Sequence, residues 1–266
     1  MQLVKFTNGS DRTPQAGLLE QGRVIPLARG PRALTDILHS PDFPANLEKL
    51  RASAVEGLPL DSVRLLAPID DHEVWGAGVT YERSKIAREE ESQRAATFYD
   101  LIHRAPRPEL FFKATPNRVV GPGEAIRVRK DSAWCVPEPE LALVLSPQLR
   151  LLGFTVGDDV SSRDIEGENP LYLPQAKMYK ACCALGPAIT LTSAIDDPRS
   201  ITIRLEIERG GSTVFDGTTS VAKMVRTLDE LIGWLGRDNC FPNGVVLLTG
   251  TGLIPPDEFS LQTGDI

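Results

Sequence analysis

The second half of this chain consists largely of short apolar segments that end at prolines and glycines. Segments such as Leu110–Lys113, Glu138–Leu145 and Leu151–Val156 have the length and the residue types of strands. The chain shows no regular alternation of strands with helices and no internal repeat. The pattern therefore predicts an α+β fold, mainly β.

Other segments refine this expectation. Further strands are expected near residues 118–120, 125–129, 201–209 and 214–216. A helix is expected over Ala222–Leu235, where apolar residues recur at helical spacing, and a buried strand followed by a glycine loop over Gly244–Gly252. The stretch Leu58–Pro68 is expected to be a connection.

Residues 1–66 differ from the rest because no combination of residues there could carry catalysis. They alternate strand-like pieces at Gln2–Phe6 and Gly22–Pro26 with a helix-like stretch at Leu34–His39. We therefore predict a small N-terminal domain over 1–66, followed by a catalytic domain over 70–266.

Composition and charge exclude several classes of protein. With 266 residues, of which 41% are hydrophobic and 24% charged, the chain is long enough for a real core and is not disordered. Its net charge is −7 and it has no basic stripe, so we expect no nucleic-acid partner. It has no apolar run that could span a membrane and no secretory signal at its start, so we expect no membrane association and a cytoplasmic location.

Cysteine and histidine give little support for a zinc site or a histidine-based triad. The three histidines lie far apart in the sequence, and the cysteines show no Cys-x-x-Cys spacing. We expect the four cysteines, Cys135, Cys182, Cys183 and Cys240, to be reduced and buried.

Two glutamates stand where core residues are expected. Strand alternation over residues 137–145 places Glu138 and Glu140 on the same face as Ala142 and Val144. Unpaired buried carboxylates are very costly, so two interpretations remain: a wet strand end, or neutralisation by a bound cation.

A second strand-like segment supplies another pair of acids, Asp158 and Asp159, beside apolar residues. One of them offers a third carboxylate ligand. Three carboxylates without histidine or thiolate suit a hard cation such as Mg²⁺ or Mn²⁺.

Two further residues carry both a common and a catalytic interpretation. Lys177 lies in a mildly apolar loop-like stretch; most lysines are exposed, but beside a divalent cation it would serve as a proton shuttle or a substrate anchor. Glu109 follows Pro108 and leads into Leu-Phe-Phe; it is either a solvated residue at a strand start or a half-buried carboxyl that keeps its proton, as a general acid must.

The segment 81–105 is dense in charges of both signs and lacks proline and glycine. A solvated surface helix is the common interpretation of such a run. The functional alternative is a lid over a site.

Taken together, these motifs resemble the fumarylacetoacetate hydrolase superfamily. The resemblance runs from about residue 74 to the C-terminus and rests on the order and spacing of these motifs: Gly78-Val-Thr-Tyr81, Pro108-x-Leu-Phe-Phe-Lys113, Glu138-x-Glu140, Asp158-Asp159-Val-Ser-Ser-Arg-Asp164, Lys177, Leu185-Gly186-Pro187 and Thr249-Gly-Thr-Gly252.

The resemblance implies a mixed β-roll, preceded by a small N-terminal domain, in a homodimer or homotetramer. It also implies that Glu138, Glu140 and Asp159 hold Mg²⁺, with Mn²⁺ or Ca²⁺ as possible substitutes. Asp158 occupies a position where the family has asparagine and is not expected to be a ligand.

Two features depart from the family pattern. The carbon–carbon hydrolases of the family carry a lid histidine a few residues after the tyrosine, where this chain has Ser84, so their water-activating dyad is missing. Members also usually continue past Asp265 and Ile266 with another strand or two.

Four features resemble the branch that contains 2-keto-3-deoxy-D-arabinonate dehydratase and related sugar-acid dehydratases: Glu109, the Gly78-Val-Thr-Tyr81 start, the Ala87-Arg-Glu-Glu-Glu-Ser92 run and the segment 166–177. This implies a hydro-lyase of pentose catabolism that converts 2-keto-3-deoxy-D-arabinonate or xylonate, a small-molecule 2-keto acid, to 2,5-dioxopentanoate and water. Lys177 or a metal-bound water would take the C3 proton, and Glu109 would protonate the departing C4 hydroxyl.

In the same scheme Thr80, Gly250 and Thr251 would contact the substrate. An alternative is hydrolysis or decarboxylation of acylpyruvate-like diketo acids on the same metal site, with Glu82 or another lid glutamate as the base. A catalytically silent binding protein is a third possibility, but it leaves three converging acids and a lysine unexplained.

Overall fold

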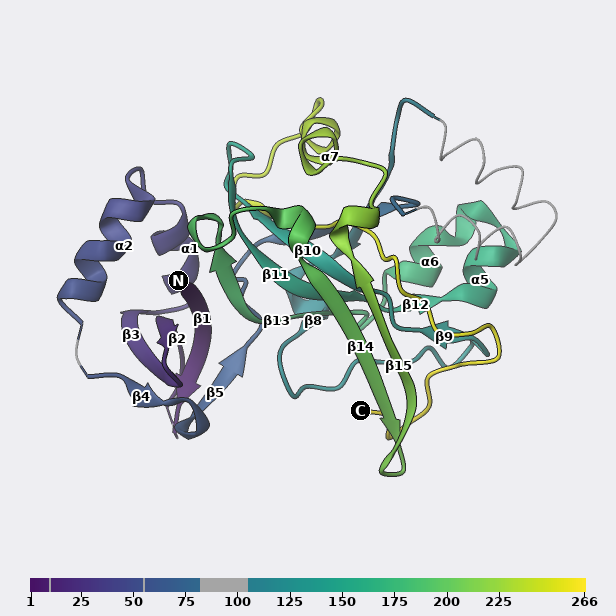
Figure 1. Ribbon diagram of the computed structural model, residues 1–266, viewed down its shortest axis with the longest axis horizontal. Helices are drawn as coiled ribbons and strands as arrows, with labels where there is room; N and C mark the ends of the chain where they lie inside the picture. Colours follow the sequence, from purple (N-terminus) through teal and green to yellow (C-terminus); the bar gives the residue numbers. More distant parts are fainter. Residues whose placement is uncertain (10, 55, 82–104) are drawn as a thin grey trace.

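The computed structural model describes residues 1–9, 11–54, 56–81 and 105–266. A large mixed sheet runs through this part of the chain, and helices lie around it (Figure 1). The predicted α+β, mainly β, class is confirmed. The charged segment interpreted as a surface helix or a lid, including Glu82 and Ser84, lies outside the described residues.

The N-terminal strands form one end of the large sheet. They are β1 (Gln2–Asn8), β2 (Asp11–Glu20), β3 (Arg23–Arg29), β4 (Leu58–Pro59) and β5 (Val63–Leu66), with helices α1 (Ala33–Leu38) and α2 (Phe43–Ala52). Two residue pairs, Gln2 with Thr190 and Leu3 with Ile189, join β1 to the next strand of the sheet. The division into domains 1–66 and 70–266 stays a prediction.

The other strands carry the sheet to its opposite edge. They are β6 (Glu73–Gly78), β7 (Glu109–Ala114), β8 (Val119–Val120), β10 (Pro139–Leu145), β11 (Leu151–Asp159), β13 (Cys183–Leu191) and β16 (Val245–Leu248). The order along the sheet is β4-β3-β2-β1-β13-β11-β10-β16-β6-β7.

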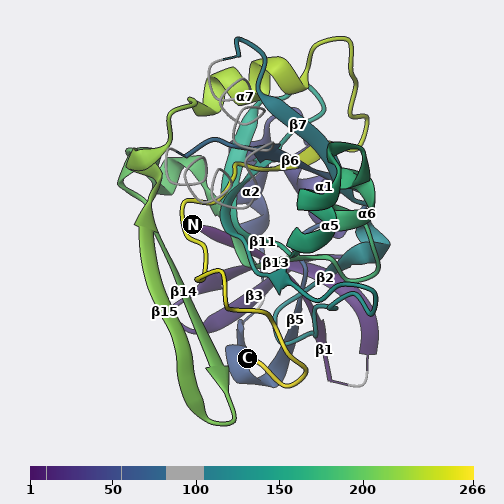
Figure 2. The same ribbon diagram turned by 90° about the vertical axis from the view of Figure 1, so that its right-hand side faces the viewer.

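Two further strand pairs and three further α-helices lie outside the large sheet in the described ranges. The strand pairs are β9 (Cys135–Val136) with β12 (Ser161–Ser162), and β14 (Thr202–Arg209) with β15 (Ser212–Ser220). The helices are α5 (Arg163–Glu168), α6 (Leu173–Lys177) and α7 (Leu228–Leu235). Figure 2 shows the long β14–β15 hairpin along one side of the molecule, with α7 near the top.

Alternating residues of β10 supply two different cores. Ala142 and Val144 face a cluster that includes residues of α1 and α2, whereas Leu141, Leu143 and Leu145 face a cluster that includes residues of α7. Both faces of β10 are therefore buried, which explains its nearly continuous apolar sequence. Any charged residue on this strand must find a partner inside the protein.

Strand register brings the predicted acids together where β10 begins and β11 ends. Pro139 pairs with Asp158, and the Asp159 amide donates to the carbonyl of Glu138 at 3.0 Å. At the far edge of the same sheet, Gly78 of β6 pairs with Glu109 of β7.

Three local predictions differ from the structure. The expected helix over Ala222–Leu235 begins only at Leu228, because the Thr227 side chain accepts a hydrogen bond from the Glu230 amide and caps the helix there. Residues 125–129 form no strand, and the stretch Leu58–Pro68 contains β4 and β5 rather than a plain connection.

A buried polar cluster, here called the linker cluster, ties the N-terminal strands to the start of the next region. Lys5 Nζ lies 2.7 Å from Asp70 Oδ1 and 2.6 Å from the Ile69 carbonyl. The other Asp70 oxygen accepts from the amide and hydroxyl of Thr35 at 2.7 and 2.9 Å. His72 completes the cluster, with its ring 5.5 Å from that of His39.

Two sequence expectations about side chains and membranes can be checked directly. The four cysteines, all in the described ranges, are free; three are buried, but Cys240 is exposed, which corrects the expectation for that residue. Its position in the Asn239–Phe241 loop, outside any strand or helix, explains the exposure. No described helix is long and apolar enough to cross a membrane.

Candidate metal centre and active site

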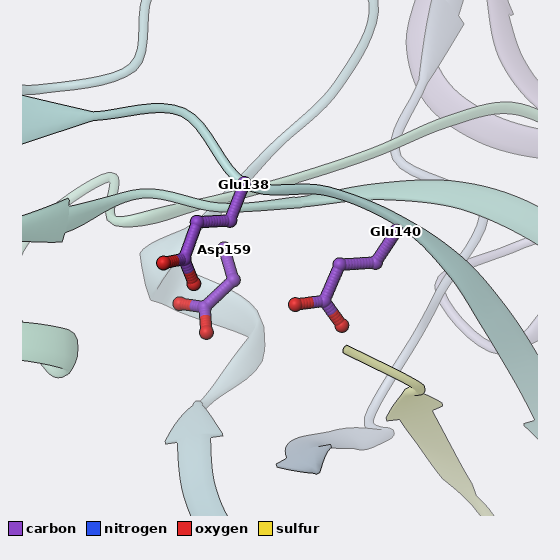
Figure 3. Close-up of side chains that lie close together, drawn as sticks. All are labelled: Glu138, Glu140 and Asp159. Atoms are coloured by element: carbon purple, nitrogen blue, oxygen red, sulfur yellow. The ribbon is translucent and has the colours of Figure 1, made fainter. Parts of the chain in front are cut away.

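Three buried carboxylates converge where β10 begins and β11 ends: Glu138 directly precedes β10, Glu140 lies on it, and Asp159 is the last residue of β11. Glu138, Glu140 and Asp159 are 2%, 3% and 1% exposed. One oxygen from each lies within 4.8 Å of the others, and Figure 3 shows the three side chains projecting to the same side of the backbone. The cluster follows from strand alternation in β10 and from the register that places Asp159 beside Glu138.

Cationic side chains surround two of these carboxylates. Glu138 Oε1 lies 2.7 Å from Arg163 Nη2, and Glu138 Oε2 lies 2.7 Å from Lys177 Nζ. Asp159 Oδ2 lies 3.0 Å from the same Lys177 nitrogen, and Asp159 Oδ1 forms an ion pair with Lys113. The interpretation as a wet strand end is therefore wrong, because both faces of β10 are covered and the acids are buried among charged partners.

Glu140 has different surroundings. Its Oε2 accepts a hydrogen bond of 2.6 Å from the Gly250 amide. Burial, followed by the nearby charges of Asp159 and Glu138, raises the pKa of Glu140 well above its usual value. A divalent cation in the cluster would relieve this, because it favours the ionised carboxylate.

Asp158 is not one of the three clustered carboxylates. The family resemblance likewise gave it no role as a metal ligand. Its Oδ1 accepts from the backbone amide of Glu138 at 2.8 Å. Burial raises the pKa of Asp158 to about 7, against the effect of that hydrogen bond. The side chain thus fixes the start of β10 and stands outside the group of three ligand oxygens.

A pocket opens over the carboxylates. Its walls combine the three acids with cationic, glycine and apolar residues, namely Ala77, Gly78, Val79, Phe111, Arg163, Lys177, Gly250, Thr251 and Ile254. A mixture of apolar walls with a few converging polar groups is typical of a small-molecule site.

Lys177, the last residue of α6, reaches into this pocket and is 1% exposed. Besides Glu138 and Asp159, its ammonium contacts Ser161 Oγ at 2.6 Å. The exposed interpretation of this lysine is therefore wrong, because the chain turns at the end of α6 and directs the side chain inward. Three acceptors around the nitrogen match the three donors of an ammonium.

Glu109 lies at the start of β7, beside the pocket. Its carboxylate packs on Gly78, a pocket residue, so closely that a methyl group added to Gly78 would lie 2.1 Å from Glu109 Oε2. Glu109 is half-buried, as expected for the catalytic interpretation. Its role as an acid stays a prediction.

The predicted substrate contacts lie together but already have partners in the protein. Thr80 Oγ1 donates to the Thr249 carbonyl at 2.6 Å, and the Gly250 amide donates to Glu140. Thr251 Oγ1 donates to the Leu253 carbonyl at 3.0 Å, although Thr251 lines the pocket. These contacts shape the loop after β16, and direct binding of substrate by the three residues stays a prediction.

The sequence interpretation missed two charged residues of this site, Lys113 and Arg163. Both occurred in the quoted motifs but received no role. The sequence carried a signal for both residues. Lys113 follows Leu-Phe-Phe inside a strand segment, where a charge is unusual, and Arg163 stands within the motif Asp158-Asp159-Val-Ser-Ser-Arg-Asp164.

Comparison with known proteins adds the family. The model of the fumarylacetoacetate (FAA) hydrolase C-terminal family matches residues 73–266. The chain belongs to this family. That range contains the pocket lining described above, with the acidic cluster and Lys177, and also Glu109 beside the pocket.

Relatives of this fumarylacetoacetate hydrolase family chain include two dehydratases. It is 52% identical to a "Probable 2-keto-3-deoxyxylonate dehydratase" of Haloferax volcanii, over 74% of this chain and 68% of the relative. It is 47% identical to a "2-dehydro-3-deoxy-D-arabinonate dehydratase" of Saccharolobus solfataricus, over 80% of this chain and 73% of the relative.

A solved structure of a dehydratase is also similar to this chain. A 2-keto-3-deoxy-D-arabinonate dehydratase, solved with magnesium and 2,5-dioxopentanoate, is 38% identical and superposes with a TM-score of 0.82. The match covers all of this chain and 92% of that one. The fold class implied by the family resemblance is therefore confirmed.

Proposed function

We propose that this protein is a magnesium-dependent dehydratase that converts 2-keto-3-deoxy-D-arabinonate or xylonate to 2,5-dioxopentanoate and water. The observation that carries the proposal is the pocket, in which three buried carboxylates and the ammonium of Lys177 converge. About half of the aligned residues are identical to those of two dehydratases that act on such sugar acids.

The donor set fits magnesium. Glu138, Glu140 and Asp159 would hold the ion, since it prefers oxygen ligands and each residue offers a carboxylate oxygen within 4.8 Å of the others. When bound, the ion supplies a Lewis acid that draws electron density from the C2 carbonyl and so makes the C3 proton more acidic. Mn²⁺ or Ca²⁺ should occupy the same oxygen site.

Lys177 is the candidate for the C3 proton transfer. Its nitrogen faces the pocket and is held between Glu138, Asp159 and Ser161. In the ammonium form it donates a proton or anchors an anion, and after losing one proton it can accept the C3 proton. A water at the site is the alternative base.

Glu109 is the candidate for the C4 end of the substrate. Placed on Gly78 at the pocket wall, a protonated Glu109 would donate its proton to the departing C4 hydroxyl, which leaves as water. Loss of the C3 proton and the C4 hydroxyl gives an unsaturated keto acid, and a proton shift from C5 completes 2,5-dioxopentanoate.

The first test is direct. The protein is incubated with Mg²⁺ and 2-keto-3-deoxy-D-arabinonate, and 2,5-dioxopentanoate is measured through an aldehyde dehydrogenase; cleavage of an acylpyruvate is measured in parallel. We expect product in the first assay and none after chelation of the metal. Product in the second assay alone would contradict the proposal and favour the hydrolase.

A second test separates the two proton transfers. In D₂O with 2-oxobutyrate, which has no C4 hydroxyl, Glu109→Gln should still exchange the C3 protons, while its dehydration falls by about 10²- to 10⁴-fold. Lys177→Met should lose both reactions. Glu73→Gln, at the other end of β6 and exposed, is the matched control. Wild-type dehydration by Glu109→Gln would remove Glu109 from the mechanism.

We also propose that the protein acts as a homodimer or homotetramer in the cytoplasm. The family resemblance supports the assembly, and exposed apolar side chains such as Val156 and Leu171, 56% and 83% exposed, offer surface for it. Light scattering after size exclusion would measure the mass, and a monomer at micromolar concentration would contradict the assembly.

A further inference from the structure

Lys113 is a fully buried lysine that contacts Asp159 without lining the pocket. It lies on β7 and is 0% exposed. Its ammonium pairs with Asp159 and donates to the carbonyls of Val160 and Lys177 at 3.0 and 2.7 Å. It is absent from the pocket lining, so these contacts hold the site without touching a bound substrate.

The three acceptors come from two separate parts of the fold. Asp159 is the last residue of β11, Val160 follows it, and Lys177 is the last residue of α6. In the sheet order, β10, β16 and β6 stand between β11 and β7. The Lys113 side chain therefore connects a strand at the sheet edge to one in its middle, and both to a helix end.

Glu138 and Asp159 each share one oxygen with Lys177 and give the other oxygen to a second cation, here called the outer cation. Lys177 takes one oxygen of Glu138 and one of Asp159 on the pocket side. The remaining oxygen of Glu138 goes to Arg163, and that of Asp159 goes to Lys113. A carboxylate oxygen has a second lone pair, so an outer cation orients the group and still leaves lone pairs for a metal.

We infer that Lys113 is a positioning residue, which holds the Asp159 carboxylate and the end of α6 so that Asp159 and Lys177 face the pocket together. The inference rests on the proposed function for its kinetic part. A lysine suits the task because one ammonium carries three donors in tetrahedral directions and meets a charge and two carbonyls. An uncharged side chain would leave Asp159 without its outer partner and the two buried carbonyls without this donor.

Calorimetric titration with Mg²⁺ tests the inference without any turnover. In Lys113→Met we expect a folded protein that binds Mg²⁺ about 10-fold more weakly. A role through charge alone predicts the opposite sign, because removing a nearby cation strengthens the attraction of Mg²⁺. Lys5→Met is the matched control: Lys5 also binds one aspartate and one carbonyl, but in the linker cluster, and its Mg²⁺ affinity should equal that of the wild type.

Steady-state kinetics give a second readout. At saturating Mg²⁺, Lys113→Met should lower kcat about 10- to 100-fold and change KM less than about threefold. Lys113→Arg keeps the charge with a different reach, and should lower kcat about three- to tenfold. If Lys113→Met does not fold, the arginine variant decides: a loss in that range supports the inference, and wild-type kcat and Mg²⁺ affinity overturn it.

The outcomes separate this inference from the proposed function. Tighter or unchanged Mg²⁺ binding together with unchanged kcat in Lys113→Met would overturn the positioning role. Equal losses in Lys113→Met and Lys5→Met would also overturn it, since they would show a general effect on folding. A wild-type protein that forms no 2,5-dioxopentanoate would instead refute the proposed function, and the Mg²⁺ titrations would still decide whether Lys113 positions the ligands.

Discussion

The active site and the linker cluster are both groups of buried charge, but they are organised differently. In the linker cluster one lysine meets one aspartate, and backbone and hydroxyl donors occupy the second carboxylate oxygen. In the active site three carboxylates lie within 4.8 Å of one another beside a pocket. In the first arrangement the one carboxylate meets one ammonium, whereas in the second Glu138 and Asp159 meet cations and a third carboxylate, Glu140, accepts from a backbone amide beside a pocket that a ligand can reach.

This difference separates stability from function. A balanced buried pair holds its surroundings together and becomes costly only when one partner is removed. In the active site Glu138 and Asp159 already have cationic partners, but burial and their charges raise the pKa of Glu140, so the ionised form of Glu140 gains most from a bound cation. Four experiments test this contrast.

The largest effect is expected from Glu140→Gln. Loss of one ligand should lower turnover by at least about 1,000-fold, because the Lewis acid would be held poorly. The metal-free variant should melt at the same temperature as the metal-free wild type or higher, because the amide removes a buried negative charge and can still accept from Gly250. Differential scanning calorimetry with chelator measures this, and a clearly lower melting temperature would contradict the contrast.

The same chemical change should act in the opposite way in the linker cluster. Asp70→Asn leaves the Lys5 ammonium without its charged partner, so the free energy of unfolding should fall by about 3 kcal/mol. Turnover per folded molecule should not change. Urea denaturation measures the first quantity and the dehydration assay the second; a variant with full stability but impaired turnover would reverse the assignment of the two regions.

Acid should weaken the linker cluster through His72. Burial, followed by the charge of His39, lowers the pKa of His72 to about 4. The unfolded chain takes up this proton near pH 6.5, so it binds more protons than the folded state between about pH 6.5 and 4. The free energy of unfolding should therefore fall as the pH falls through this window, by at most about 3 kcal/mol from this group.

His72→Asn tests this contribution, because asparagine keeps an acceptor for the Asp70 amide and does not titrate. Its stability should fall less than that of the wild type between pH 6.5 and 4. Parallel denaturation curves at each pH give the difference, and identical pH profiles would exclude His72 as the source.

The smallest effect is expected from Thr80→Val. Loss of the hydrogen bond to the Thr249 carbonyl should cost about 1 kcal/mol of stability. If Thr80 only supports the loop, KM should change less than about threefold; a direct contact with the substrate carboxylate would raise KM by about tenfold or more. Stability and KM measured on the same preparation decide between support and contact.

Strand alternation predicts that Glu138 and Glu140 share a face with core residues, but it leaves a wet strand end and a bound cation as alternatives. The set of three ligands, Glu138, Glu140 and Asp159, came from the family resemblance. Which cations pair with these acids does not follow from alternation, because Lys113 and Arg163 reach them from β7 and α5; the sequence shows only that a lysine inside a strand segment is unusual. Contacts of this kind depend on the curvature of the sheet, which no local pattern encodes.

The start of α7 illustrates a different limit. Apolar residues continue at helical spacing before Leu228, so periodicity alone extended the helix to Ala222. The side chain of Thr227 fixes the start instead, and the backbone before it is extended at Met224. Capping chemistry outweighed periodicity there.

The close packing of Glu109 on Gly78 has an evolutionary consequence. If Gly78 were replaced by alanine in the course of evolution, the new methyl group would push the Glu109 carboxylate aside, although the gene would still encode every charged residue of the active site. Loss of dehydration could then begin at a residue that has no side chain and takes part in no proton transfer. If Glu109 is the proton donor, as proposed, its inheritance depends on the glycine beside it as much as on the glutamate itself.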